Sequence, residues 1–341
     1  MHFGPTAAQE ELRQRARRRF EEVAPSAEVR RLMETETGFD RDVWRQLAAE
    51  LDLARLGWVE RGVLLEEAGR VLLPAPLLAT ASTAGLVDPA PPGAVATLAM
   101  AEASGRWDEG AVETRAVGSN GSGWRLEGRK SYVVDGIAAD VLVVSARTDE
   151  GEVRLFQVDG SAGGVSCTPL ATVDPTRKQA EVTLAAAPAR LLDASSAQAV
   201  ELAVVALAAE QVGGAERCLE MAVAHAGRRV QFGRPIGSFQ AVKHLCAEML
   251  LELESARGAA FYAATAAARG DADLPAAAAV AKSSCSDAFV RVATDALHVH
   301  GGLGFTWDHD AHLYFKRARS SAQLFGDARH HRELLARHLD L

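Results

Sequence analysis

The chain has 341 residues, of which 48% are hydrophobic and 24% charged, a composition typical of globular proteins. Its 37 Lys and Arg against 45 Asp and Glu give a net charge of −8, which argues against a nucleic-acid-binding protein. The dense basic stretch at residues 15–19 has acidic neighbours and is predicted to be a solvated helix face. The apolar runs are shorter than the ~20 residues of a membrane span, and no signal-peptide core is present. We therefore expect a soluble, cytoplasmic protein with no nucleic-acid or membrane partner.

Cysteine, histidine and serine residues are candidates for metal binding or nucleophilic catalysis. The four cysteines are far apart and form no Cys-x-x-Cys pair, so they are expected to be buried thiols in a reducing compartment. The C-terminal histidines contain no His-Glu-x-x-His pair, so a surface or interface cluster is favoured over a metal site. These histidines are His298, His300, His309, His312, His330 and His331. A nucleophile elbow of the form Gly-x-Ser-x-Gly is also missing.

The first part of the chain has helical periodicity, from Thr6 to about Leu73. A short helix is predicted over residues 63–70, ending before Pro74 and Pro76 because helices usually end ahead of proline. A Pro-rich stretch over residues 87–93 then separates this part from the next.

The middle of the chain changes to a period of two, which is typical of strands. Strands are predicted at residues 124–134, 141–144, 153–158 and 180–184, with a turn at Asp135-Gly136. This segment is predicted to form a small antiparallel sheet or barrel.

Helical periodicity returns near Ser196 and continues to the end of the chain. Four long apolar helices are predicted, at residues 199–228 (broken at Gly213-Gly214), 239–269, 276–299 and 312–338. Helices that are apolar on several sides indicate a four-helix bundle that packs against copies of itself or a partner.

Two glycine-bearing segments join these helices. Residues 228–240 place two to three arginines beside a turn and a helix start, which suits a phosphate group as well as it suits capping of the preceding helix. Residues 298–306 contain Gly-Gly-Leu-Gly, which is no dinucleotide fingerprint because no strand precedes it. Glycines there would let a ligand or a neighbouring subunit approach the backbone closely.

Together the two segments resemble the acyl-CoA dehydrogenase family, through Arg-x-x-Phe-Gly-x-Pro-Ile-x-x-Phe-Gln followed by Gly-Gly-x-Gly-Phe. The short subunits of heteromeric, actinobacterial-type members are the nearest in kind. The resemblance covers the whole chain and implies an α+β, multi-domain fold. It implies a shortened N-terminal helical domain (residues 1–92), a middle antiparallel β domain (93–195) and a C-terminal four-helix bundle (196–341).

The resemblance also implies a function. In that family FAD binds between subunits, a carboxylate removes the α-proton of an acyl-CoA thioester, and the β-hydrogen passes to the flavin as hydride. The positions that match the family's contacts to the FAD phosphates and adenine are Arg229, Phe232, Gln240, His298, Gly301 and Gly302. His298 stands where the family usually has Gln.

The flavin-ring half departs from the family pattern. The Thr-Glu-Pro…Gly-Ser-Asp loop corresponds to residues 101–108, where the hydroxyl donor has become Ala101. The Trp-x-Thr that covers the flavin corresponds to residues 132–134, beginning with Tyr132.

The catalytic base departs as well, because Phe325 stands at the usual glutamate position. Other carboxylates that could act as the base are Glu201, Glu210 and Asp327, each displaced from the family positions. The base is therefore left unassigned.

Three hypotheses follow: a subunit active only with a related subunit that carries the base, most simply as an α2β2 heterotetramer; a self-sufficient homo-oligomer with a displaced base; or a non-catalytic scaffolding relative. Under the first, which we favour, the substrate is an acyl-CoA in lipid or steroid β-oxidation. The electron acceptor would be an electron-transfer flavoprotein or a similar protein.

Overall fold

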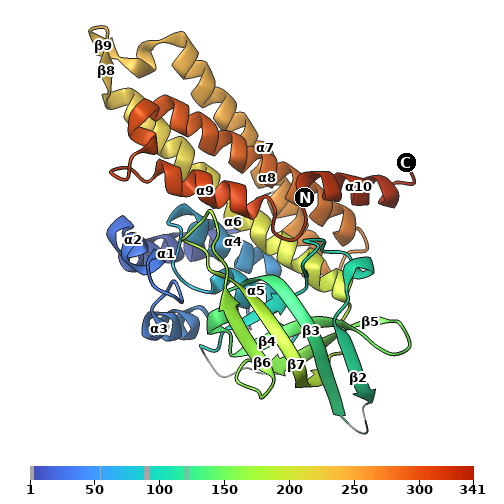
Figure 1. The fold of residues 1–341 in the computed structure, drawn as a ribbon. Coiled ribbons are helices and arrows are strands. Elements are labelled where there is room, and N and C mark those ends of the chain that lie inside the picture. Colours follow the sequence, from blue (N-terminus) through green and yellow to red (C-terminus); the bar gives the residue numbers. More distant parts are fainter. Residues whose placement is uncertain (1–3, 54, 88–92, 120, 122) are drawn as a thin grey trace. The chain divides into compact units, whose positions relative to one another are not determined.

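The computed structural model describes residues 4–53, 55–87, 93–119, 121 and 123–341 (Figure 1). The chain divides into two compact units. One comprises Met1–Val29, Gly57–Leu73 and Val204–Leu341, and the other comprises Arg30–Leu56 and Pro74–Ala203. The domain boundary expected near residue 92 falls at residues 88–92, which lie outside the described residues.

The N-terminal part is helical, as predicted. Its helices are α1 (Ala7–Val23), α2 (Ser26–Met33), α3 (Arg41–Leu51), α4 (Trp58–Arg70) and α5 (Leu77–Thr83). The helix predicted over residues 63–70 is α4, which begins earlier, at Trp58. Helix α5 was not predicted; Pro76 is its N-cap, a place where proline's missing N–H interrupts no helical hydrogen bond.

The C-terminal helices are α6 (Ser196–Arg228), α7 (Gln240–Arg269), α8 (Leu274–His300), α9 (Ala311–Ser321) and α10 (Ala328–His338). The single helix predicted over residues 312–338 is wrong: it is α9 and α10, separated where Phe325 and Gly326 have positive φ values of 57° and 96°. That conformation ends a right-handed helix.

The predicted break in α6 at Gly213-Gly214 is also wrong, because the helix continues through both residues. A Cβ on Gly213 would lie 1.7 Å from the carbonyl oxygen of Glu66 in α4, and a Cβ on Gly69 would lie 2.0 Å from that of Glu210 in α6. The backbones of α4 and α6 therefore touch, and glycine is present to allow this approach rather than to end a helix.

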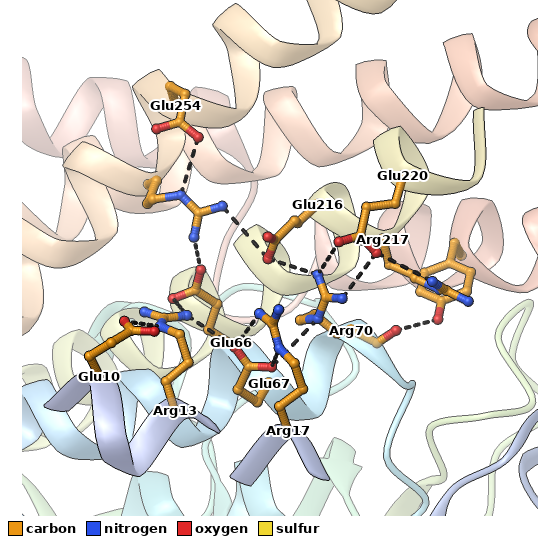
Figure 2. Close-up of polar contacts among 12 residues, drawn as sticks. Glu10, Arg13, Arg17, Glu66, Glu67, Arg70, Glu216, Arg217, Glu220 and Glu254 are labelled. Atoms are coloured by element: carbon orange, nitrogen blue, oxygen red, sulfur yellow. Dashed lines mark hydrogen bonds and ion pairs between the residues drawn. The ribbon is translucent and has the colours of Figure 1, made fainter. Parts of the chain in front are cut away.

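An ion-pair network surrounds this helix crossing (Figure 2). Its residues come from α1, α4, α6 and α7: Glu10, Arg13, Arg17, Glu66, Glu67, Arg70, Glu216, Arg217, Glu220, Glu254 and Arg257. At its centre, the fully buried side chain of Glu67 pairs with Arg13 at 3.1 Å, Arg17 at 2.8 Å and Arg70 at 3.5 Å. Arg17 was expected on a solvated face; it is instead half-buried, and its bond to Glu67 raises its pKa.

The other unit contains a seven-stranded sheet. Its strands are β1 (Ala96–Ala99), β2 (Arg115–Ser119), β3 (Gly123–Val134), β4 (Val141–Arg147), β5 (Val153–Asp159), β6 (Val165–Pro169) and β7 (Gln179–Leu191). The strand order is β1-β4-β2-β3-β7-β5, with β6 on β7 and an additional β4–β5 pairing. Most pairs are antiparallel, as predicted, but β4 pairs in parallel with β1 and β2.

The turn signal at Asp135-Gly136 does not form a tight hairpin. Asp135 has φ 54° and leads into a 3₁₀ segment, Gly136–Ala138, and β3 pairs with β2 and β7 instead of with β4. The core of the sheet is apolar and includes Leu126, Leu142 and Phe156, all fully buried.

Candidate functional site

A short arm at the end of α6 carries the first group of candidate residues. Arg229 donates its backbone N–H to the carbonyl of His225 (2.8 Å) and accepts from the N–H of Ile236 (2.8 Å), which closes the hairpin of β8 (Val230–Gln231) and β9 (Arg234–Pro235). Phe232 forms the tip with φ 53° and is 91% exposed. The side chains of Arg229 and Phe232 are exposed. The hairpin of β8 and β9 lies at one end of the helical unit (Figure 1).

The arm is stiffened by an aromatic contact. The guanidinium of Arg234 lies 4.1 Å from the ring centroid of Phe239, and the Phe232 and Phe239 rings meet edge to face at 6.1 Å. Gln240, the first residue of α7, is exposed next to this pair. An exposed phenyl ring held in a fixed position can stack on a planar group supplied by a ligand.

The glycine loop is the second group, and the structure brings it to the arm. The ring of His225, one turn before Arg229, lies 4.6 Å from the ring of His300, the last residue of α8. Gly301 follows with φ 60° and ψ −142°, which strongly favours glycine, and a Cβ on Gly301 or Gly302 would have no atom within 4 Å. The loop thus presents bare backbone to solvent.

These residues suit a phosphate group. The exposed guanidinium of Arg229 can form a charge-assisted, bidentate bond to phosphate oxygens, and exposed glycine backbone lets an anion approach the N–H groups. His298 is also exposed, with Nδ1 3.7 Å from a carboxylate oxygen of Asp295. The six predicted cofactor positions therefore lie on two segments of one unit. The ring contact between His225 and His300 joins α6 and α8 next to these segments.

The loop over residues 101–108 belongs to the other unit. Glu102 is buried, and its carboxylate accepts the N–H groups of Glu113 and Thr114 (2.9 Å each) and the ammonium of Lys130 (2.7 Å). Burial alone would raise the pKa of Glu102, but these donors outweigh it, so its pKa is lowered. Burial lowers the pKa of Lys130 to about 8, against the opposing effect of Glu102. Glu102 therefore acts as an internal brace.

Residues 103–106 of this loop are exposed, and two side chains of the loop bind each other. The guanidinium of Arg106 forms two bonds to the carboxylate of Asp108, at 2.9 and 2.8 Å. A Cβ on Gly105 would lie 3.9 Å from the ring of Tyr132, which has φ 59°. Ala101 is buried and has no hydroxyl to donate. Unlike the arm and the glycine loop, this segment does not suit the group that the family pattern places here.

The residue at the usual position of the catalytic base is buried. Phe325 is 4% exposed, and its carbonyl accepts a hydrogen bond from Nε2 of His331 at 2.8 Å. Burial lowers the pKa of His331 to about 4. Lys282, fully buried, donates to the carbonyls of Ser321 (3.2 Å) and Ala322 (3.1 Å) and so holds the start of the same loop.

The three other carboxylates occupy different environments. Glu210 is buried against Arg317, at 3.2 Å, in the helical unit. Asp327 accepts the N–H of His330 (2.8 Å) as the N-cap of α10. Glu201 lies near the start of α6 and is half-buried, which raises its pKa.

Two expectations about Cys and His need correction. Only Cys218 and Cys285 are buried; Cys167 and Cys246 are partly exposed, and all four thiols are free. The histidine cluster is not a surface feature as a whole, because His300, His312 and His331 are buried. No group of three or more potential metal ligands occurs among the residues that the structure describes.

Two cavities open in the helical unit, of about 210 and 280 Å³, and neither is lined by the predicted site residues. Within the described parts of the chain, no helix combines the length and apolarity needed to cross a membrane.

Comparison with known proteins decides the family. Residues 97–186 match the model of the acyl-CoA dehydrogenase middle domain, and residues 196–339 match that of the acyl-CoA dehydrogenase C-terminal domain. The chain belongs to the acyl-CoA dehydrogenase family. The predicted fold class and the assignment to a family of oxidoreductases are thereby confirmed.

Similar proteins extend this result. Acyl-CoA dehydrogenase IpdE2 of Mycobacterium tuberculosis is 35% identical over 318 residues, covering 90% of this chain and 89% of that protein. A variant of the Tcur3481-Tcur3483 steroid ACAD superposes with a TM-score of 0.90, 31% identity and coverage of 98% of each chain. The ChsE4-ChsE5 complex of M. tuberculosis gives a TM-score of 0.89 and 27% identity, covering 100% of this chain and 99% of that one.

Sequence reasoning missed several residues that shape the site. These residues are far apart in sequence. Glu102 forms an ion pair with Lys130, and Lys282 donates a hydrogen bond to the loop that contains Phe325. A lysine among apolar residues is the signal that the sequence offers for such a contact, because a buried ammonium group needs hydrogen-bond acceptors. The sequence alone does not say which acceptors these are.

Proposed function

We propose that this chain is one subunit of a cytoplasmic, FAD-dependent acyl-CoA dehydrogenase that desaturates the α,β bond of an acyl-CoA thioester. It supplies the half of the cofactor site that holds the FAD phosphates and adenine. A related, longer subunit supplies the flavin-ring loop and the catalytic base. The working assembly would be α2β2.

The observation that carries this proposal is the unequal state of the two half-sites. Arg229, Phe232, Gly301 and Gly302 are exposed and unobstructed, whereas the loop over residues 101–108 has Ala101 in place of the family's hydroxyl donor, and its Arg106 and Asp108 side chains bind each other. Phe325, at the usual base position, is buried and cannot take up a proton. A homo-oligomer would repeat these defects at every site, because symmetry makes its interfaces equivalent.

FAD, when bound, would accept the β-hydrogen of the substrate as hydride. Arg229 would pair with a phosphate, and Phe232 would cover the adenine, on the surface that faces the partner. Gln240, His298 and the two glycines would contribute hydrogen-bond donors around the same phosphates.

The names of two structural neighbours support a bulky substrate and a hetero-oligomer. One is called a steroid ACAD, and the other is a complex of two proteins, ChsE4 and ChsE5. We extend both features to this chain: a steroid or other lipid acyl-CoA as substrate, in β-oxidation, and a paralogous partner. The reduced cofactor would pass its electrons to an electron-transfer flavoprotein or a similar acceptor.

We also propose the three-part organisation at residues 1–92, 93–195 and 196–341. Limited proteolysis of the assembled protein, with mass spectrometry of the fragments, tests these boundaries.

One observation favours the self-sufficient alternative. Glu201 has a raised pKa because it is half-buried, and a raised pKa is what a general base working near neutral pH needs. The third hypothesis, a scaffold without catalysis, leaves the exposed Arg229 and the bare glycine loop without a purpose.

Co-expression with candidate paralogues tests the proposal. The chain alone should be colourless or poorly soluble, because the apolar surface of its helical bundle, which includes exposed Leu250 and Leu251, lacks a partner. The complex should be yellow, with about one FAD per two chains, since only one of the two kinds of interface is complete. A yellow homo-oligomer that oxidises an acyl-CoA by itself would overturn the proposal, and a colourless complex with every paralogue would favour the scaffold.

A further inference from the structure

Three imidazole rings, with neighbouring planes tilted by 35° and 46°, form a row at the two ends of the glycine loop, and we name this row the histidine stack. The His300 ring lies between two others, 4.6 Å from the ring of His225 and 4.3 Å from the ring of His309. His225 comes from the last turns of α6, His300 ends α8, and His309 precedes α9. The stack thus joins three elements at one point.

Hydrogen bonds show whether Nδ1 carries a proton in two of the three rings. Nδ1 of His300 lies 2.7 Å from the carbonyl of Ala296, which can only accept, so this nitrogen carries the proton. Nε2 of His300 is buried and has no hydrogen-bond partner, so it can gain a proton only at the cost of burying an unpaired N–H. Nδ1 of His309 accepts the N–H of Ala311, the first residue of α9, at 3.1 Å, so this nitrogen is unprotonated.

Charged groups near the three histidine rings come from several elements and differ in their exposure. On α6, Arg229 adds a cation; burial, the two neighbouring imidazoles and Arg229 together lower the pKa of His225. On α8, Asp295 lies beside the exposed His298 rather than against His300. Next to His309, Asp308 is exposed and Asp310 accepts from the hydroxyl of Ser26 (2.8 Å). At the start of α7, Lys243 and His244 are both exposed.

We propose that His300 and His309 are positioning residues that hold the glycine loop in place only while the stack is neutral, so that the order of this loop depends on pH. Protonation of His309 at Nδ1 breaks its bond to the start of α9, and protonation of His300 places a charge between two other imidazole rings. Either event loosens residues 301–310. The link to FAD rests on the proposed function; the loop transition itself does not.

The direction of the pH effect follows from the linkage between proton binding and closure of the loop. The closed loop binds fewer protons than the open one, so closure is favoured above the ordinary histidine pKa of about 6.5 and is lost as pH falls. Opening that takes up one proton becomes about 10-fold more frequent for each pH unit of acidification below that range.

Hydrogen–deuterium exchange of the full chain, alone or in its complex, tests this at pH 7.5 and 5.5 after correction for intrinsic exchange rates. Protection of peptides covering residues 298–310 should fall by about 10-fold at pH 5.5, while β3 keeps its protection. The double variant His300→Phe/His309→Asn removes both titratable rings but keeps an aromatic ring at residue 300 and an oxygen acceptor for the N–H of Ala311, so its protection should be nearly the same at both pH values. His338→Phe, on an exposed residue of α10, should behave as the wild type.

Unchanged wild-type protection, or an equal loss in His300→Phe/His309→Asn, would refute the stack as a pH-dependent clamp. If the double variant does not fold, the single variants His300→Phe and His309→Asn should each lose less protection in acid than the wild type, and a loss equal to that of the wild type in both would refute the clamp. FAD retention after desalting at the two pH values is measured separately. A complex that holds no FAD counts against the proposed function, whereas a loop that opens in acid without any FAD still supports the clamp.

Discussion

Arg229 is the residue by which the proposed cofactor contact is most directly tested. Its guanidinium is exposed beside the glycine loop. A charge-assisted bond to phosphate contributes about 1.5–3 kcal/mol, so Arg229→Ala should weaken FAD retention by roughly 10- to 150-fold. Flavin absorbance of the assembled complex after dialysis measures this. Arg329→Ala removes the same charge from α10, where the side chain is 86% exposed, and should leave retention unchanged; equal loss in both variants would point to a general charge effect.

The residues at and near the usual base position give a second test. Phe325→Ala should leave turnover of the complex largely intact, apart from packing losses, because a phenyl ring moves no proton. Glu201→Gln, Glu210→Gln and Asp327→Asn should each affect turnover mildly, although Glu210→Gln removes a carboxylate that pairs with buried Arg317 and should lower stability. A fall in kcat of roughly 10³-fold in a folded variant would identify the base in this chain and favour the self-sufficient enzyme.

Individual residue types were readable from the sequence to different degrees. The segments around Arg229 and the glycines were predicted to be loops between helices, and the resemblance to the family assigned cofactor positions to them. The buried histidines were not predicted: His300 and His331 are stabilised by bonds to backbone carbonyls, and a backbone partner leaves no mark in sequence. The raised pKa of Glu201 likewise depends on what packs around it.

At the scale of elements, the crossing of α4 and α6 is the least tolerant contact. Gly213→Ala places a methyl group 1.7 Å from a carbonyl oxygen of α4, so the two helices must separate and strain the ion pairs that surround them. We expect a loss of at least about 1–3 kcal/mol in the free energy of unfolding. Chemical denaturation followed by circular dichroism measures it.

Gly258→Ala is the matched control. Gly258 also lies inside a long helix, α7, but a Cβ there would meet no atom within 4 Å. Alanine favours the helix over glycine by about 0.5–1 kcal/mol, so this variant should be slightly more stable than the wild type. Destabilisation of both variants to the same degree would contradict the close-approach explanation for Gly213.

Elements were predicted well where periodicity was long and poorly where it was short. Helices α6, α7 and α8 and strands β3, β4 and β5 follow clear patterns. Strands β1, β2 and β6 were missed because each has only four or five residues, and β6 is an edge strand that ends at Pro169. The separation of α9 from α10 depends on positive φ at Phe325, which no phenylalanine signals.

At the scale of the whole molecule, sequence motifs identified the family before the fold was known, since a few residues at a binding surface are more distinctive than a long apolar helix. The same motifs left the partner undetermined. A missing base is visible in a sequence, but the subunit that would replace it is encoded elsewhere. The co-expression experiment is therefore the test on which the proposed α2β2 assembly depends.

The exposed arm at residues 229–235 has a thermodynamic consequence under the proposed division of the site. If FAD bridges two chains, any factor by which FAD tightens the association of the subunits equals the factor by which association tightens FAD binding, because the two equilibria are linked. Release of the cofactor would then be governed by the lifetime of the complex, and dilution of the enzyme would itself strip the flavin. Cellular FAD concentration would thus set how much of this subunit is assembled at all.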